Sequence, residues 1–433
     1  MEMEKDIDKD ISINIEKIKK RFHNTSDLKF REIKLGYVNT TLIIVFIDGI
    51  IDSDMLEDSV ILRITDTFNN EKAAKGKNLI ESLTEKVLTT PSVTTLKSLD
   101  KLADAIIQGN AVIVIDGFQE AISVNVTKWK ERSLEESLGE RALKGVMIGF
   151  TERASTNISI VRSIIKTEDF CVTKKTLGTK SKTDVYLLYI EGIVDKDILK
   201  EVQKRVDALT IKYLLDTFVI EEALKGKPKT FFPLTLPSER PDVVSSALLE
   251  GRVTIIVDGS PKVIITPALF EDFLQSPDEY YTSYGRFSIR FIRLMSFIIS
   301  LFLPGVYVSL DHIDKKRISK KVYEIFITKD EFLPTFLEVF ILLILLRIIL
   351  DASVRMPKGI ALTISFLASI LIGQTAVEAK LVHPVSILVV GITVIISMVL
   401  GNKGLNGAII TIRATFRYYG DNRGSNIIIR IYD

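Results

Sequence analysis

The sequence predicts an α/β soluble N-terminal region of two duplicated subdomains, followed by an α-helical transmembrane bundle of about four helices. Two observations indicate this fold class. The 433 residues are 47% hydrophobic yet 26% charged, and the two kinds are segregated: charge dominates to about residue 284, apolar residues from there to about 400. In addition, motifs in the front part recur about 142 to 150 residues later, a distance longer than any solenoid period.

The expected domains follow this division. Residues 1–138 and 139–284 are the two soluble α/β subdomains, residues 285–402 the transmembrane helical domain, and residues 403–433 a short C-terminal tail or truncated last helix. The acidic N-terminus has no basic and apolar signal sequence. We therefore expect the large front region to remain cytosolic.

The duplication rests on matched segments in matched order. Each copy is predicted to have a β-rich opening, two helical stretches and a closing hairpin. Asp52 and Asp195 follow one matched segment in each copy and can cap the next helix. The matched pairs are Phe46-Ile47-Asp48-Gly49-Ile50 with Tyr189-Ile190-Glu191-Gly192-Ile193, Lys75-Gly76-Lys77 with Lys225-Gly226-Lys227, and Ile115-Asp116-Gly117 with Val257-Asp258-Gly259.

Some of these repeated motifs have two interpretations. The aspartates of Asp116-Gly117 and Asp258-Gly259 could be acidic site residues, but Asp-Gly best tolerates the positive φ of a tight hairpin, which favours turns. The Lys-Gly-Lys pairs could suggest phosphate binding, but no Walker spacing accompanies them. We prefer the interpretation that each glycine ends a helix, with the lysines placed favourably near the negative end of the helix dipole.

Residues 238–281 predict a short helix, a strand, a tight turn and a second strand directly before the apolar region. Pro241 suits a first helical position, because its missing N–H would have no partner there. Gly251 closes the helix. Asp258-Gly259 then joins two apolar runs as a hairpin.

Four apolar segments are candidate membrane spans, at about residues 291–310, 332–350, 360–377 and 385–400. Each is at or slightly below the usual spanning length. The alternative is a buried helical core, but four such segments without an amphipathic partner elsewhere favour lipid. Pro304 is expected to kink or end the first span.

Polar side chains within spans are costly in lipid and are therefore candidates for function. Glu338 and Arg347 in the second span could line a water-filled pore or make contacts within an oligomer, or Arg347 could snorkel. In the third span Ser365, Ser369 and Gly373 form a small-residue stripe, for which helix packing is the favoured role. Gln374 and Glu378 continue near that face.

Several function classes lack their sequence features. The net charge of +2 argues against a nucleic-acid-binding protein. With Cys171 as the single cysteine and three histidines, an internal disulfide is excluded and a structural zinc site is improbable. No nucleophile elbow, dinucleotide fingerprint or zinc-protease motif occurs, so we expect neither an enzyme nor a cofactor.

A set of motifs occurs in one order along the second copy and the apolar part. Together they resemble the A subunits of spore nutrient germinant receptors, the GerA family of spore-forming bacteria. The motifs are Glu239-Arg240-Pro241-Asp242, Leu248-Leu249-Glu250-Gly251-Arg252, Val257-Asp258-Gly259, Pro267-Ala268-Leu269-Phe270, Gln275-Ser276-Pro277, Gly373-Gln374-Thr375-Ala376-Val377-Glu378 and Val382-His383-Pro384.

The resemblance implies a multi-pass subunit in the lipid of the spore inner membrane, with its N-terminal domain on the core side. It implies a homo-oligomeric ring that conducts ions, gated through a transporter-like B subunit and a lipoprotein C subunit. The chain departs from the family pattern at Val146 and Ile148, in the second span around Arg347, and in its short C-terminus. A non-conducting, diverged or truncated scaffold subunit of the same kind of complex is therefore the alternative.

Overall fold

The computed structural model describes residues 6–35, 40–70, 78–88, 90, 92–128, 148–226, 230–275, 285–310, 332–355, 357, 360, 363, 373–400 and 405–410. The chain divides into two compact units. The first unit contains residues 1–228 and 234–268, and the second contains residues 229–233 and 269–433. The predicted domain boundaries after residues 138, 284 and 402 lie at segments outside the described residues, and they stay predictions.

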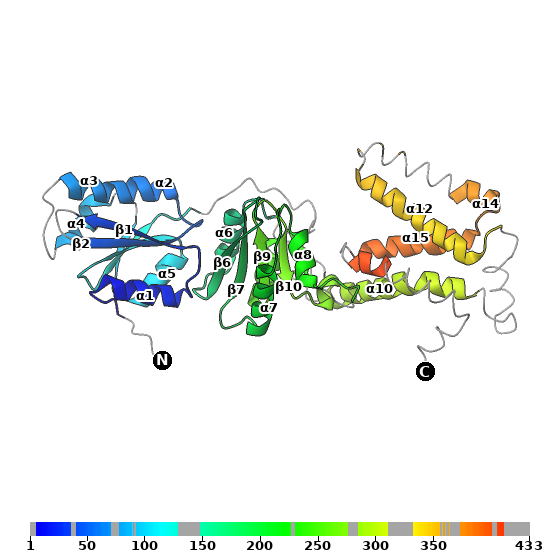
Figure 1. The fold of residues 1–433 in the computed structure, drawn as a ribbon, viewed down its shortest axis with the longest axis horizontal. Coiled ribbons are helices and arrows are strands. Elements are labelled where there is room, and N and C mark those ends of the chain that lie inside the picture. The colour runs from blue at the N-terminus through cyan, green and yellow to red at the C-terminus, as the bar shows by residue number, and fades with distance from the viewer. Residues whose placement is uncertain are drawn as a thin grey trace. The chain divides into compact units, whose positions relative to one another are not determined.

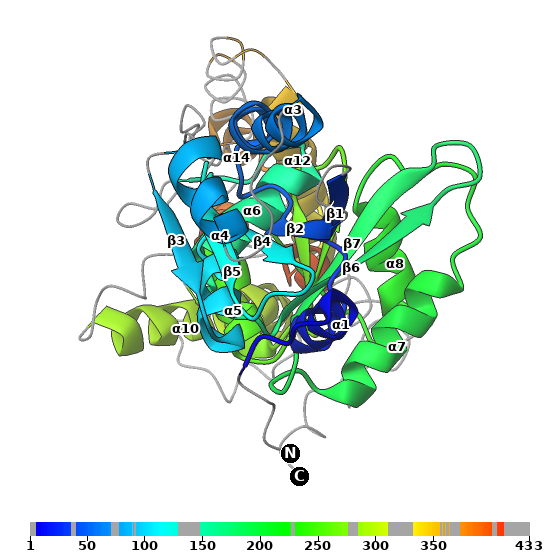
Figure 2. The ribbon, with the colours of Figure 1, turned by 90° about the vertical axis from the view of Figure 1, so that its left-hand side faces the viewer.

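The first copy is a five-stranded antiparallel sheet with helices on both faces. Its strand order is β1-β2-β4-β5-β3. Helices α1 and α5 cover one face and α2 and α3 the other, as both views show (Figures 1 and 2). The strands are β1 (Leu28–Leu35), β2 (Thr40–Ile47), β3 (Val93–Leu96), β4 (Asn110–Ile115) and β5 (Ala121–Asn125). The helices are α1 (Ile11–Arg21), α2 (Ser53–Leu56), α3 (Leu62–Asn70), α4 (Asn78–Ser82) and α5 (Leu99–Ile107), with π-helical turns at Glu57–Ile61 and Leu83–Val87.

The second copy repeats this plan. Its antiparallel strand order, β6-β7-β9-β10-β8, is the order of the first sheet with each strand replaced by its counterpart. One face of the sheet buries a core with α6 and α9, and the other face buries a core with α7 and α8. The strands are β6 (Phe170–Leu177), β7 (Thr183–Ile190), β8 (Leu236–Ser238), β9 (Val253–Val257) and β10 (Val263–Thr266). The helices are α6 (Ala154–Ile164), α7 (Lys196–Asp207), α8 (Phe218–Lys225) and α9 (Pro241–Leu249).

The burial pattern of each strand agrees with this layering. The central strands β9 and β10 are buried at every position, because helices cover both faces of the sheet and an apolar side chain is stable on either side. The edge strand β1 instead alternates buried and exposed residues over part of its length.

The predicted helix caps are confirmed. The Asp52 side chain accepts hydrogen bonds from the first backbone N–H groups of α2, and the Asp195 side chain does the same for α7.

The regular secondary structure described in the second unit is helical. It contains a short 3₁₀ helix (Phe270–Phe273), α10 (Gly285–Leu310), α12 (Thr335–Arg355), α14 (Ala376–Glu378) and α15 (Pro384–Val399). Helix α15 lies against both α10 and α12 (Figure 1). The helices meet through an apolar cluster that includes Tyr307, Val339, Leu342 and Val390.

Within the described residues, one helix, Phe287–Leu310, is long and apolar enough to cross a membrane. Pro304 lies inside α10 and the helix continues to Leu310, so the proline does not end it. Helix α12 overlaps the second predicted span but carries Glu338, Arg347 and Asp351. Helix α15 overlaps the fourth and is apolar but has 16 residues. Most of the third predicted span, residues 360–377, lies outside the described residues.

Candidate functional site

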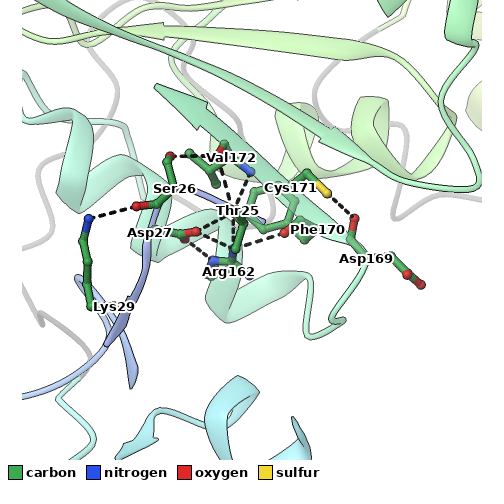
Figure 3. Close-up of polar contacts among 9 residues, drawn as sticks. All are labelled: Thr25, Ser26, Asp27, Lys29, Arg162, Asp169, Phe170, Cys171 and Val172. Atoms are coloured by element: carbon green, nitrogen blue, oxygen red, sulfur yellow. Dashed lines mark hydrogen bonds and ion pairs between the residues drawn. The ribbon is translucent and has the colours of Figure 1, made fainter. Parts of the chain in front are cut away.

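A buried polar joint connects the two copies within the first unit (Figure 3). Arg162 of α6 forms a two-pronged ion pair with Asp27, the residue before β1: Nε to Oδ2 is 2.5 Å and Nη2 to Oδ1 is 2.9 Å. Both residues are buried, at 4% and 8% exposure. We call this group, with Thr25, Ser26, Phe170 and Val172, the inter-copy joint.

The carboxylate, hydroxyl and guanidinium of the joint bond to one another and to the backbone. The Thr25 hydroxyl donates to Asp27 Oδ1 at 2.6 Å, and Arg162 Nη2 also donates to the Phe170 carbonyl at 3.1 Å. The guanidinium lies 4.7 Å from the centre of the Phe170 ring, a favourable cation–π distance. A buried ion pair with its hydrogen bonds satisfied avoids the cost that a lone buried charge would carry.

The same joint covers a sheet edge. Strand β6 is the edge strand of the second sheet, and the chain before β1 bonds to it. The Ser26 amide donates to the Val172 carbonyl at 2.8 Å, and the Val172 amide donates to Thr25 Oγ1 at 2.9 Å. The first copy thus satisfies backbone groups that an open edge would leave free for pairing with another chain.

Charged contacts surround the joint. Arg21 of α1 donates to Glu168 of the second copy and to Asp100 of the first. Burial lowers the pKa of Arg21, but the hydrogen bonds and the charge attraction of Glu168 and Asp100 together outweigh it and raise the pKa. His23 Nε2 lies 3.0 Å from Asp169 Oδ1.

The single cysteine lies beside these contacts. Burial raises the pKa of the Cys171 thiol to about 11, so this free cysteine is a weak nucleophile at neutral pH.

A second feature repeats in both copies: a buried asparagine that bonds to the backbone six residues earlier. In the second copy Asn157 Oδ1 accepts from the Thr151 amide at 2.8 Å, and its Nδ2 donates to the Thr151 carbonyl at 2.6 Å. In the first copy Asn14 makes the same two bonds to Asp8, at 2.8 and 2.7 Å. Both asparagines are fully buried. The sequence contains an Asn-Ile dipeptide at each place, Asn14-Ile15 and Asn157-Ile158, but the dipeptide alone does not reveal this role.

The two Asp-Gly dipeptides lie at hairpin turns, and each binds the start of its own copy's first helix. Asp258 Oδ1 accepts from the Ala154 amide at 3.0 Å, and Asp116 Oδ1 accepts from the Ile11 amide at 3.3 Å. The Gly259 amide donates to the Glu152 carbonyl at 2.7 Å. These aspartates cap helices α6 and α1, which gives them a structural role.

The remaining family-signature residues hold the start and the end of α9. Arg240 is 1% exposed and pairs with Asp242 at 2.6 Å, while the Glu239 carbonyl accepts from the Phe150 amide at 2.8 Å. Pro241 is the first helical residue, as expected. Gly251 has φ +86°, and a Cβ there would lie 2.7 Å from the Ile193 carbonyl oxygen, so this close approach requires glycine.

In the helical unit, Glu338 belongs to a buried polar network. Its Oε2 accepts from Ser386 Oγ at 2.6 Å and from the His383 amide at 3.2 Å. The hydroxyls of Tyr307 and Ser386 are 3.0 Å apart. Glu338 is 2% exposed and Ser386 fully buried. This Glu338 network joins α10, α12 and the start of α15, and it contains two residues, Tyr307 and Ser386, that sequence reasoning missed.

The other predicted polar residues of this unit are not brought together with it. Arg347 is exposed on α12, and no ion pair joins it to Glu338 in the described part of the chain. Gly373 is half-buried, and Gln374 and Glu378 are exposed. Ser365 and Ser369 lie outside the described residues. Across the described ranges, no group of three or more His, Cys, Asp or Glu side chains is placed to hold a metal ion.

Comparisons with known proteins agree with one another. The family model described as "Bacillus/Clostridium GerA spore germination protein" matches residues 16–423. Spore germination protein KA of Bacillus subtilis is 35% identical over 388 residues, which are 89% of this chain and 71% of that protein. Spore germination protein B1 of the same organism is 30% identical, over 98% of this chain and 88% of that protein.

One solved structure is also similar. It is the N-terminal domain of the A subunit of the Bacillus megaterium spore germinant receptor GerK3, at 32% identity and a TM-score of 0.49. The match covers 61% of this chain and 97% of that domain.

Proposed function

Because this chain belongs to the GerA family of Bacillus and Clostridium spore germination proteins, we propose that it is a membrane subunit of a spore nutrient germinant receptor. The observation that carries the proposal is the extent of the match, residues 16–423, which takes in both sheets and every described helix of the second unit. Relatives that cover nearly the whole chain are themselves spore germination proteins, which supports a role in germination.

In this proposal the subunit oligomerises into an ion-conducting channel in the spore inner membrane, with several membrane-crossing helices and the two-copy domain in the cytosol of the spore core. Helix α10 supplies one span of sufficient length. The Glu338 network supports a bundle in which α12 and α15 accompany α10, because polar groups in lipid must find partners within the protein. The exposed Arg347 on α12 is the candidate to face a pore or a neighbouring subunit.

Gating in this proposal is a shift between closed and open states of the ring. A transporter-like B subunit would bind the nutrient and a lipoprotein C subunit would complete the complex. A nutrient can move this equilibrium only by as much as its affinity differs between the two states. The inter-copy joint supports transmission of such a shift, because it links the two copies through a buried contact that resists deformation. No catalytic step or cofactor forms part of the proposal.

One observation favours a second candidate, a non-conducting scaffold subunit of the same kind of complex. Helix α12 carries Arg347, Asp351 and Arg355 in its C-terminal half, and such a helix is costly to insert into a bilayer. A subunit with this helix could assemble with partners without forming a pore of its own.

The proposal is tested in spores of the source strain with the gene deleted and then restored. We expect the protein in the inner-membrane fraction prepared without detergent, and nutrient-triggered release of monovalent cations that is lost on deletion and regained on restoration. A chain found in the supernatant would contradict the membrane role. Normal cation release in the deletion strain across a panel of nutrients would contradict the receptor role.

A further inference from the structure

The second copy exposes a compact group of large apolar side chains. Tyr213, Leu215 and Phe218, in the connection from α7 to α8 and at the start of α8, are 53%, 81% and 61% exposed. Exposed apolar residues are common singly, but three within six positions form a patch that calls for an explanation. We call these residues, with Lys180, Lys182 and Lys212, the docking patch.

The patch is held in a fixed shape. The Thr179 and Lys180 amides of the β6–β7 turn donate to the carbonyls of Ile211 and Lys212, both at 3.0 Å. The Leu214 amide donates to Ser181 Oγ at 3.0 Å, and Thr183 Oγ1 donates to the Leu214 carbonyl at 2.8 Å. The Leu214 side chain is 1% exposed and anchors the loop in the core. The apolar side chains are therefore presented on an ordered loop.

The charge of the patch is positive. Lys180, Lys182 and Lys212 are exposed, and none of them forms an ion pair with any described residue. Lys174 and Lys175, on the adjoining strand, differ in this respect, because they pair with Asp184 and Asp207. Lys180 Nζ lies 5.9 Å from the centre of the Tyr213 ring, so the cationic and apolar groups are intermixed on one surface.

The acidic residue between Leu215 and Phe218 does not neutralise these lysines. Asp216 is exposed, and its carboxylate accepts from the Thr217 amide and hydroxyl at 2.6 and 3.0 Å. Among the residues that the structure describes, the patch therefore offers three lysines without an ion pair, beside one carboxylate that bonds to its own loop. A second copy of the same face would place lysines against lysines, which disfavours a symmetric protein contact.

We propose that the docking patch binds the surface of an anionic membrane. Tyr213, Leu215 and Phe218 enter the boundary between headgroups and acyl chains, and the three lysines face anionic lipid phosphates, as in other peripheral membrane sites. The inference rests on the proposed membrane location, since a chain anchored in a bilayer keeps that surface within reach. It adds a lipid-binding surface to the soluble part of the protein.

The test uses the full chain in lipid nanodiscs, with Leu215→Cys labelled by an environment-sensitive fluorophore in a Cys171→Ala background. The discs contain phosphatidylcholine alone or with 30% phosphatidylglycerol, and a nitroxide-bearing lipid is the quencher. The matched control carries the label at Leu249, which is 55% exposed on α9. We expect quenching at position 215, and not at 249, in the phosphatidylglycerol discs.

The lysines supply the electrostatic part of the test. Each lysine near an anionic surface contributes roughly a fivefold factor to binding. Replacing all three with glutamine should therefore lower the ratio of docked to undocked label on the order of 100-fold. Added salt should act in the same direction.

Three outcomes would overturn the proposal. These are an unquenched label at position 215 in a chain that stays in the disc, equal quenching in both lipid mixtures, and energy transfer between two labelled chains without lipid quenching. The last would identify a second copy as the occupant. A chain that never enters the disc would instead contradict the proposed membrane function, so the two failures are distinguishable.

Discussion

Arg162 and Asp27 stand 135 positions apart in the chain and form a two-pronged ion pair, with N–O distances of 2.5 and 2.9 Å. Each belongs to a different copy of the duplicated unit, and each is almost fully buried. Together with the Ser26–Val172 backbone bond, this pair joins the two sheets within the first compact unit.

Asp27→Ala should destabilise the protein strongly. It leaves the Arg162 guanidinium buried without its counter-charge, and breaking one side of a buried pair costs roughly 3–5 kcal/mol. The measurement is the free energy of unfolding of the full chain by denaturant.

The control for this prediction is Glu32→Ala. Glu32 pairs with Lys34 at 3.8 Å on the surface, where the two side chains are 55% and 81% exposed. Exposed pairs contribute about 0–1 kcal/mol. Equal effects of the two substitutions would contradict the role assigned to the inter-copy joint.

Gly251→Ala should cost more stability than Gly259→Ala. Both glycines have positive φ, +86° and +91°, so both substitutions carry backbone strain of about 1–2 kcal/mol. Only at Gly251 would the new Cβ lie 2.7 Å from the Ile193 carbonyl oxygen, while nothing lies within 4 Å of the corresponding position at Gly259. The difference in thermal midpoint between the two variants isolates the steric part. A larger loss at Gly259 would refute this account of the α9 terminus.

Cys171 should react slowly and only at high pH. Its folded pKa of about 11 lies above the ordinary value of 9.0, so at pH 8 the thiolate is roughly 100-fold rarer than in an unfolded chain. Because the folded state holds the proton more tightly, the associated stability is fully present below pH 9 and is lost as the pH rises through 11. The rate of alkylation by iodoacetamide against pH measures the titration. Cys171 is the only cysteine in the chain, so the alkylation rate reports on this thiol alone. An alkylation midpoint near pH 8 would contradict its burial.

Glu338→Leu should destabilise the helical unit more than Glu338→Gln. Glutamine keeps an oxygen that can accept from Ser386 and from the His383 amide, whereas leucine leaves those donors without it, at about 1–3 kcal/mol. The thermal midpoint of the detergent-solubilised chain measures the difference. The exposed Glu378 supplies the control, because Glu378→Leu and Glu378→Gln should differ little. If the two Glu338 variants were indistinguishable, the network would have no packing role.

The duplicated α/β plan could be predicted from sequence because its signals are local. Apolar runs, Asp-Gly turns and the capping residues Asp52 and Asp195 each act within a few positions. Strands β3 and β8 gave no such signal, because they are short and partly polar, and their place at the sheet edge depends on pairing with β5 and β10.

The sites were less predictable for the same reason. The Arg162–Asp27 pair depends on how two segments far apart in the sequence meet, which no local sequence signal encodes. Glu338 was identified as a costly polar residue, but its partner Ser386 lies 48 positions away and is selected by the packing of α15 against α12. Of the two effects expected of Pro304, ending the helix is wrong and a kink stays a prediction. A proline within a long apolar helix can be accommodated when neighbouring groups satisfy the freed carbonyl.

Ion flux from vesicles distinguishes a conducting channel from a scaffold subunit. The vesicles contain this chain with its B and C subunit partners, either native or with Arg347→Leu, beside a parallel reconstitution of a relative that conducts ions. We expect cation release when nutrient is added to the native complex, and altered release with Arg347→Leu. Absence of nutrient-triggered flux, under conditions in which the relative conducts, would contradict the channel and leave the scaffold subunit in its place.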